Sequence, residues 1–169
     1  MESTPEEETI DYIALRRLQN RYADIVTRRA WPELGEIFHP DCTLDLSLGD
    51  RSAQFIGPKA VGTFIGESVE RFSFFQFVVL NAVFEIRSSE NRAVARMYIH
   101  ELRVERATGQ RTDAYGVYHD RFVRDENPGW RFIERHYGSF SRTAPAESEE
   151  DQVVFPLPER DLSAWIDES

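Results

Sequence analysis

The stretch RYADIVTRRAWPELGEIFHPD, residues 21–41, contains the end of one expected helix and the whole of a second. Pro32 is well tolerated at a first helical position and Pro40 does not continue a helix, so a short helix is expected between them. Apolar side chains recur every three or four residues over residues 9–29, which predicts a longer helix before it. Its apolar positions are Ile10, Ile13, Ala14, Leu18, Tyr22, Ile25 and Val26.

The second half of the chain has the composition of β-strands. Four segments rich in β-branched and aromatic residues are separated by the turn-forming sequences SSEN, ATGQ and DENPG. The segments cover residues 74–88, 92–106, 111–125 and 129–142. An earlier strand is expected over residues 42–48, and a helix after the turn at Gly57 and Pro58. Helices followed by a twisted antiparallel sheet predict an α+β fold that encloses a cone-shaped pocket.

The ends of the chain are more acidic than its middle. Residues 1–8 and 143–169 contain the excess of acidic over basic residues that gives the formal charge of −10. In the middle of the chain, acidic and basic residues are nearly equal in number. We expect a disordered N-terminus over residues 1–8, one domain over residues 9–142 and an acidic tail over residues 143–169. The end of the tail is either frayed or forms a short pocket-capping helix, with Leu162, Trp165 and Ile166 on one face.

Composition excludes several classes of protein. The acidic balance gives no general attraction to nucleic acid or to anionic membranes. A single cysteine, Cys42, excludes an internal disulfide. No stretch approaches the ~18 apolar residues of a membrane span, and the acidic start is unlike a signal peptide. We therefore expect a cytoplasmic protein with no nucleic-acid or membrane partner.

The order of the expected elements resembles the nuclear transport factor 2-like (cystatin-like) fold. More narrowly, it resembles the SnoaL-like branch, which includes scytalone dehydratase, bile-acid dehydratases and lindane dehydrochlorinase. The resemblance implies N-terminal helices packed on a strongly curved, mainly antiparallel sheet, around a pocket that works without a cofactor. It is carried by Arg21, Tyr22, Trp31, Leu34, Phe38 and Asp41, by Asn81, and by YHDRF and GWRFIER at residues 118–122 and 129–135.

The acid–base dyad of this family is missing from the chain. In the dehydratases an Asp near the end of the first helix works with a His at the start of the first strand of the meander. These positions fall on Thr27 and Phe77. Because threonine cannot act as a carboxylate and phenylalanine has no proton to transfer, the usual dehydratase mechanism is not available.

A histidine and a glutamate compete for one position in the expected pocket. The segment YIHELRVE resembles a scytalone dehydratase strand whose histidine holds the substrate, and this places His100 in the cavity. A shift of one residue instead aligns Glu101 with an acid of the bile-acid dehydratases. Since side chains alternate across a strand, only one of them can face inward without a bulge. An inward His100 would be the general base, and its alternative is a surface histidine.

Two tyrosines complete the catalytic hypothesis. Tyr22 matches a tyrosine of the bile-acid dehydratases, and Tyr118 falls at a substrate-binding position of scytalone dehydratase; both can donate hydrogen bonds to an oxyanion. Asp120 is expected to pair with an arginine of the last strand. The expected substrate-binding residues are Thr27, Phe77, Phe64, Leu46, Glu101 and Asp45, the last facing either solvent or cavity. No spacing resembles a metal site, and none is expected.

Three functions are compatible with these residues. The main hypothesis is a lyase, isomerase or cyclase that acts on a hydrophobic cyclic molecule of polyketide, steroid or terpenoid type. The rival is a non-catalytic binding or assembly protein, favoured by the missing dyad. An epoxide hydrolase of the same fold would need an Asp–Arg–Asp arrangement drawn from Arg96, Arg103, Asp113 and Asp120. A homodimer or homotrimer is expected, because such a sheet seldom covers its outer face within one chain.

Overall fold

The computed structural model describes residues 3–125 and 129–168 and confirms the α+β fold. Residues 126–128 of the expected DENPG turn, and the first two residues of the expected disordered N-terminus, lie outside the described part. The elements are α1 (Pro5–Arg28), η1 (Trp31–Glu33), α2 (Leu34–Ile37), β1 (Phe38–Ser47), β2 (Ser52–Ile56), α3 (Pro58–Glu70), β3 (Phe72–Arg87), η2 (Ser88–Glu90), β4 (Arg92–Glu105), β5 (Arg111–Val123), β6 (Arg131–Thr143), β7 (Gln152–Val154) and α4 (Leu162–Trp165).

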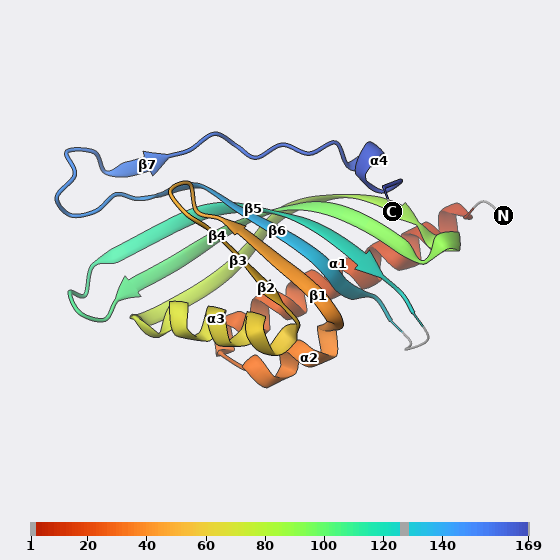
Figure 1. The fold of residues 1–169 in the computed structure, drawn as a ribbon, viewed down its shortest axis with the longest axis horizontal. Helices are drawn as coiled ribbons and strands as arrows, with labels where there is room; N and C mark the ends of the chain where they lie inside the picture. The colour runs from red at the N-terminus through yellow and green to blue at the C-terminus, as the bar shows by residue number, and fades with distance from the viewer. Residues whose placement is uncertain (1–2, 126–128, 169) are drawn as a thin grey trace.

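The strands form one curved sheet with α1, α2 and α3 on the same face (Figure 1). The strand order is β2-β1-β6-β5-β4-β3, and the short β7 pairs with β6. The pairs β3–β4, β4–β5 and β5–β6 are antiparallel, as the tight connections predict, and β1 joins β6 in parallel. The five-residue β2, which the sequence patterns did not reveal, is almost entirely exposed. The sheet and helices together enclose the cone.

Helix α1 begins at Pro5, four residues before the predicted start at Thr9. Thr4 and Glu7 form a capping box, in which each side chain accepts a hydrogen bond from the backbone N–H of the other. The buried face also differs from the expectation, because Ile10 and Ile13 are exposed. The buried Asp11 takes their place and accepts hydrogen bonds from Arg124 and from the Trp130 indole. These polar partners, which sequence periodicity does not reveal, determine how the first turns face the sheet.

A buried ion pair lies at the centre of the core. Arg135 on β6 donates two hydrogen bonds to Asp120 on β5, at 2.7 and 3.1 Å, and both side chains are completely buried. This confirms the predicted pairing of Asp120 with an arginine of the last strand. The Arg135 guanidinium lies 4.1 Å from the ring centroids of Tyr22 and Tyr118 and 4.2 Å from that of Phe132. The pair therefore joins α1, β5 and β6 in one contact.

The C-terminal tail crosses the face of the sheet opposite to α1 and α3 (Figure 1). Its helix α4 packs Leu162, Trp165 and Ile166 against Val94, and Arg121 stacks over the Trp165 ring. The expectation of a pocket-capping helix is therefore wrong, because these apolar side chains find their partners on the outer face. The tail covers part of the surface whose exposure led us to expect an oligomer. None of the described helices has the length and apolar character needed to cross a membrane.

Removing one partner of the central ion pair should destabilise the fold strongly. Asp120→Ala leaves the Arg135 charge buried and uncompensated, and the free energy of unfolding should fall by about 3–5 kcal/mol in chemical denaturation. The control is Asp24→Ala, which removes an exposed ion pair with Arg28 and should have a much smaller effect. Equal stabilities of the two variants would contradict the central role of the pair.

Candidate functional site

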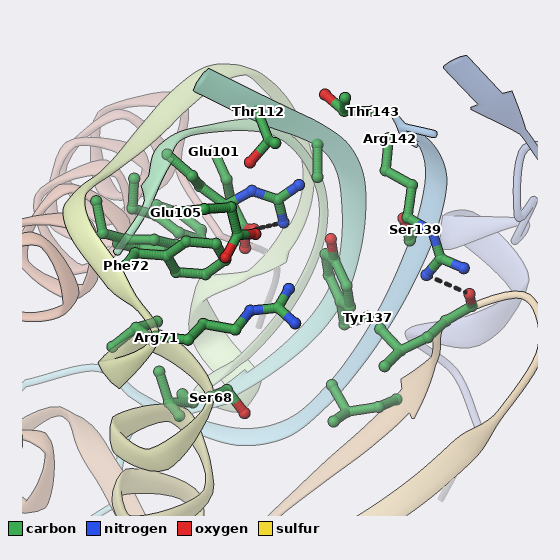
Figure 2. A pocket seen from close by; sticks show the side chains of 18 of the residues that line it. Ser68, Arg71, Phe72, Glu101, Glu105, Thr112, Tyr137, Ser139, Arg142 and Thr143 are labelled. Atoms are coloured by element: carbon green, nitrogen blue, oxygen red, sulfur yellow. Dashed lines mark hydrogen bonds and ion pairs between the residues drawn. The ribbon is translucent and has the colours of Figure 1, made fainter. Parts of the chain in front are cut away.

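The concave face of the sheet and helix α3 enclose a cavity of about 760 Å³ that opens at one end of the cone. Its floor is apolar and aromatic, and its mouth is polar, with Arg71, Glu101 and Glu105 among the side chains in Figure 2. The floor includes Tyr22, Val26, Leu44, Leu46, Phe64, Phe75, Phe77 and Tyr118, and the mouth includes Arg51, Arg71, Glu101, Arg103, Glu105, Thr112, Ser139 and Arg142. The many aromatic residues of the sequence predicted a mainly apolar cavity, and the mouth is more polar than that prediction.

Tyr22 and Tyr118 meet at the floor, above the central ion pair. Their hydroxyl oxygens are 3.4 Å apart, and both rings pack against the Arg135 guanidinium. Burial raises the pKa of both phenols, against the opposing effect of the Arg135 charge. Both tyrosines therefore remain neutral hydrogen-bond donors at any physiological pH.

Thr27 and Phe77, the positions onto which the sequence resemblance places the family dyad, contact each other. The Thr27 hydroxyl accepts a hydrogen bond from the backbone N–H of Phe77 at 3.1 Å, so Thr27 joins α1 to β3 and does not line the cavity. Phe77 does line it, and packs edge-on against Tyr22 with ring centroids 5.3 Å apart. Neither side chain can transfer a proton, so this contact gives the site a structural hydrogen bond and an apolar wall.

His100 lies on the outer face of the sheet, so the expectation that it faces the cavity is corrected. Alternation along β4 places Met97, Ile99 and Glu101 on the concave face, and the even-numbered His100 on the other. His100 stacks on Tyr115 at 4.2 Å and its Nε2 is 3.2 Å from an Asp113 carboxylate oxygen. A histidine in this position has no access to a molecule in the cone.

Glu101 is the acid that faces the cavity. Its side chain is only 19% exposed, and the nearest guanidinium nitrogen, on Arg103, is 3.5 Å from its carboxylate. Burial raises the pKa of Glu101, while the positive charges of Arg103 and Arg71 act in the opposite direction. A carboxyl group with a raised pKa in a partly apolar cavity is a stronger base than an ordinary glutamate and is suited to accept and return a proton.

The other acids from the sequence analysis lie away from the cavity. Asp45 is on the outer face of β1, where it accepts a hydrogen bond from Gln54. The Asp–Arg–Asp arrangement of an epoxide hydrolase does not form, because Asp113 and Arg96 are on the outer face while Asp120 is buried with Arg135. Across residues 3–125 and 129–168, no three His, Cys, Asp or Glu side chains are grouped to hold a metal ion.

Tyr137 is a cavity residue that the sequence reasoning missed. Its ring packs at 4.8 Å from Tyr118, and burial raises the pKa of its phenol, with the nearby Glu101 carboxylate adding to the effect. The close approach of the ring depends on Gly116 on the neighbouring strand, where an added Cβ would lie 2.2 Å from the Tyr137 Cε2 atom. Alternation from Arg135 along HYGSF was the signal that could have placed Tyr137 inside.

The arrangement brings the Glu101 carboxyl group, whose pKa is raised, and three neutral phenols to a single cavity. The carboxylate of Glu101 can take a proton, and the phenols of Tyr22, Tyr118 and Tyr137 can donate hydrogen bonds to a developing negative charge. These are the parts needed for acid–base chemistry on a small molecule.

Comparison with known proteins agrees with this geometry. The family described as SnoaL-like domain matches residues 7–136. A protein from Novosphingobium aromaticivorans with the provisional name scytalone dehydratase has 18% sequence identity and a TM-score of 0.73 over 94% of this chain and 100% of its own. Hexachlorocyclohexane dehydrochlorinase LinA-type3 from Novosphingobium barchaimii LL02 has 16% identity and a TM-score of 0.72, over 92% and 100% of the two chains.

A nuclear transport factor 2-like superfamily protein from Salmonella enterica is also similar, with 20% identity and a TM-score of 0.65 over 84% of this chain and 96% of its own. At these identities the likeness concerns the fold. No protein with a curated function matches the sequence.

Filling the space beside Tyr137 should disturb the cavity. In Gly116→Ala the new methyl group forces the Tyr137 ring to move, and we expect a loss of about 1–3 kcal/mol in the free energy of unfolding. The matched control is Gly35→Ala in α2, where an added Cβ has no neighbour within 4 Å. Chemical denaturation of both variants provides the measurement, and equal stabilities would contradict the packing described here.

Proposed function

We propose, from the premise that this chain belongs to the SnoaL-like domain family, that it is a cofactor-independent lyase, isomerase or cyclase. Its substrate is a hydrophobic cyclic molecule of polyketide, steroid or terpenoid type with a carbonyl group, held in the cone. The observation that carries the proposal is the position of Glu101, a buried carboxyl group of raised pKa that faces the cavity.

The first step is abstraction of a proton from the carbon next to the carbonyl. The Glu101 carboxylate takes the proton, the C–H bonding electrons form the enolate double bond, and the carbonyl oxygen becomes an oxyanion. A phenol O–H from Tyr22, Tyr118 or Tyr137 donates a hydrogen bond to that oxygen. Because burial keeps the phenols neutral, each retains the proton that it donates in this bond.

The second step depends on the substrate. Return of the proton from Glu101 to a different carbon gives an isomer. If the substrate has a hydroxyl group β to the carbonyl, the enolate electrons expel it, and it takes up the proton from Glu101 and leaves as water. Attack of the enolate carbon on a second carbonyl of the same molecule forms a ring, and the second carbonyl oxygen becomes an alkoxide that takes up the proton from Glu101. In each case one carboxyl group replaces the Asp–His dyad of the related dehydratases.

A second candidate is a non-catalytic binding protein for the same class of molecule. The replacement of the dyad by Thr27 and Phe77, which now form a structural contact, favours it. Both candidates predict binding of cyclic molecules in the cone, and only the enzyme predicts proton transfer by Glu101. Homo-oligomerisation and a cytoplasmic location stay predictions from the sequence.

Exchange of the α-protons of 1-tetralone in D₂O, followed by NMR, separates the two candidates. The wild-type protein should accelerate exchange, and Glu101→Gln should reduce the acceleration by roughly 10²-fold or more, since a positioned base contributes about 10²–10⁴-fold. The control is His100→Gln, one residue away on the opposite face of the sheet, which should keep the wild-type rate. Wild-type exchange no faster than that of Glu101→Gln would support the binding protein.

The same reaction should depend on pH in a defined direction. Abstraction needs the charged carboxylate, so the exchange rate constant should rise with pH and reach half its plateau at the pKa of Glu101. Because burial raises that pKa, the midpoint should lie above the ordinary glutamate value of 4.5. A midpoint at or below 4.5, after correction for background exchange, would exclude Glu101 as the base.

A further inference from the structure

We propose that the molecule bound in the cone is a carboxylic acid, whose carboxylate binds Arg71 at the mouth while its apolar body occupies the floor. This inference rests on the proposed function, because it names the substrate class of the same cavity. It depends on how the charged side chains of the mouth are engaged with one another.

Arg71 projects its side chain into the mouth without a hydrogen-bond partner among the described residues. It follows directly after α3, and Figure 2 shows its side chain reaching across the opening toward Tyr137. Its guanidinium packs over the Phe72 ring at 4.7 Å. Within residues 3–125 and 129–168, no carboxylate forms an ion pair with it and no oxygen accepts a hydrogen bond from it.

Two neighbouring guanidinium groups, in contrast, already have hydrogen-bond and ion-pair partners within the protein. Arg103 donates to the backbone carbonyl of Asp113 at 2.8 Å and pairs with Glu101. Arg142 donates to the carbonyl of Leu48 and pairs with Asp50. The charge of Glu101 is therefore balanced by Arg103, and the charge of Arg71 remains available for a ligand.

The stacking of Arg71 on Phe72 leaves the N–H groups of the guanidinium free to bind a ligand. A guanidinium that lies over a ring uses its flat face, and the N–H groups along its edge stay open to an acceptor. Two of these N–H groups match the two oxygens of a carboxylate, which forms parallel hydrogen bonds with arginine. The geometry of Arg71 thus suits a planar acceptor with two oxygens.

The surrounding acids favour a single negative charge on the ligand. Glu101 and Glu105 line the same mouth, and a phosphate with two charges would be repelled by them more strongly than a carboxylate. The apolar floor, with Leu44, Phe75 and Phe77, accepts the rest of the molecule. Arg71 and Glu101 line the same cavity, so a ligand whose carboxylate binds Arg71 lies in the space that Glu101 also faces.

Two probes that differ only in charge test the inference. 2-Naphthoate and 2-naphthamide have the same fused ring, and their dissociation constants can be measured by calorimetry at pH 7.5. The wild-type protein should bind 2-naphthoate at least about 10-fold more tightly than 2-naphthamide, the gain expected from a charge-assisted hydrogen bond. Arg71→Gln should remove this preference, and Arg71→Lys should restore part of it because lysine keeps the charge but not the paired N–H groups.

The control is Arg17→Gln, which removes the same charge from an exposed position on α1 and should leave the preference unchanged. Equal affinity of the wild-type protein for the two probes would overturn the inference, as would binding of neither probe at millimolar concentration. Loss of the preference in Arg17→Gln as well as in Arg71→Gln would also overturn it, since the effect would then come from net charge.

Failure of this inference can be told from failure of the proposed function, because 1-tetralone has no charge. Exchange that depends on Glu101, together with equal affinity for the two naphthalene probes, would leave the proposed function in place and overturn the carboxylate site. A preference for 2-naphthoate that depends on Arg71, without exchange that depends on Glu101, would support the carboxylate site and contradict the proposed catalysis.

Discussion

The buried ion pair between Asp120 and Arg135 is the interaction on which the rest of the structure depends. Two charges without solvent are tolerated only when they are paired and hydrogen-bonded, so β5 and β6 must keep their register for the fold to exist. The guanidinium also contacts the rings of Tyr22, Tyr118 and Phe132. The same contact that joins the core therefore supports the two phenols at the floor of the cavity.

The cavity above this pair has an apolar floor and a mouth lined by charged side chains. Its floor is apolar and aromatic, with Phe77 packed on Tyr22 and held to α1 by the hydrogen bond from its backbone N–H to the Thr27 hydroxyl. Titratable groups remain at the mouth, where burial works against the charge of Glu101 and Arg103 offsets part of that cost. Glu101 lies close to this apolar floor, because it is the cross-strand partner of Phe77 in the β3–β4 pair.

Much of the fold could be predicted from the sequence, and less of the site. Four segments rich in β-branched and aromatic residues, separated by turn-forming sequences, predicted the meander. The pairing of Asp120 with an arginine followed from two charges in strands that had to be neighbours. The position of His100 could not be predicted, because a pattern of period two fixes which residues share a face but not which face is concave. The N-terminal part of α1 was misjudged for a related reason, since Asp11 is buried by partners more than 110 positions away.

The sequence by itself determined the fold class and the family frame, because these follow from local periodicity and from the order and spacing of the elements. Only the tertiary structure decided that Glu101 faces the cavity, that Tyr137 joins it and that Arg71 stays unpaired at its mouth. These facts depend on the curvature of the sheet and on contacts between distant strands. The stretch RYADIVTRRAWPELGEIFHPD thus provides Thr27 to the scaffold and Tyr22 to the cavity, while the other side chains of the two proposals come from Arg71, directly after α3, and from strands β4 to β6.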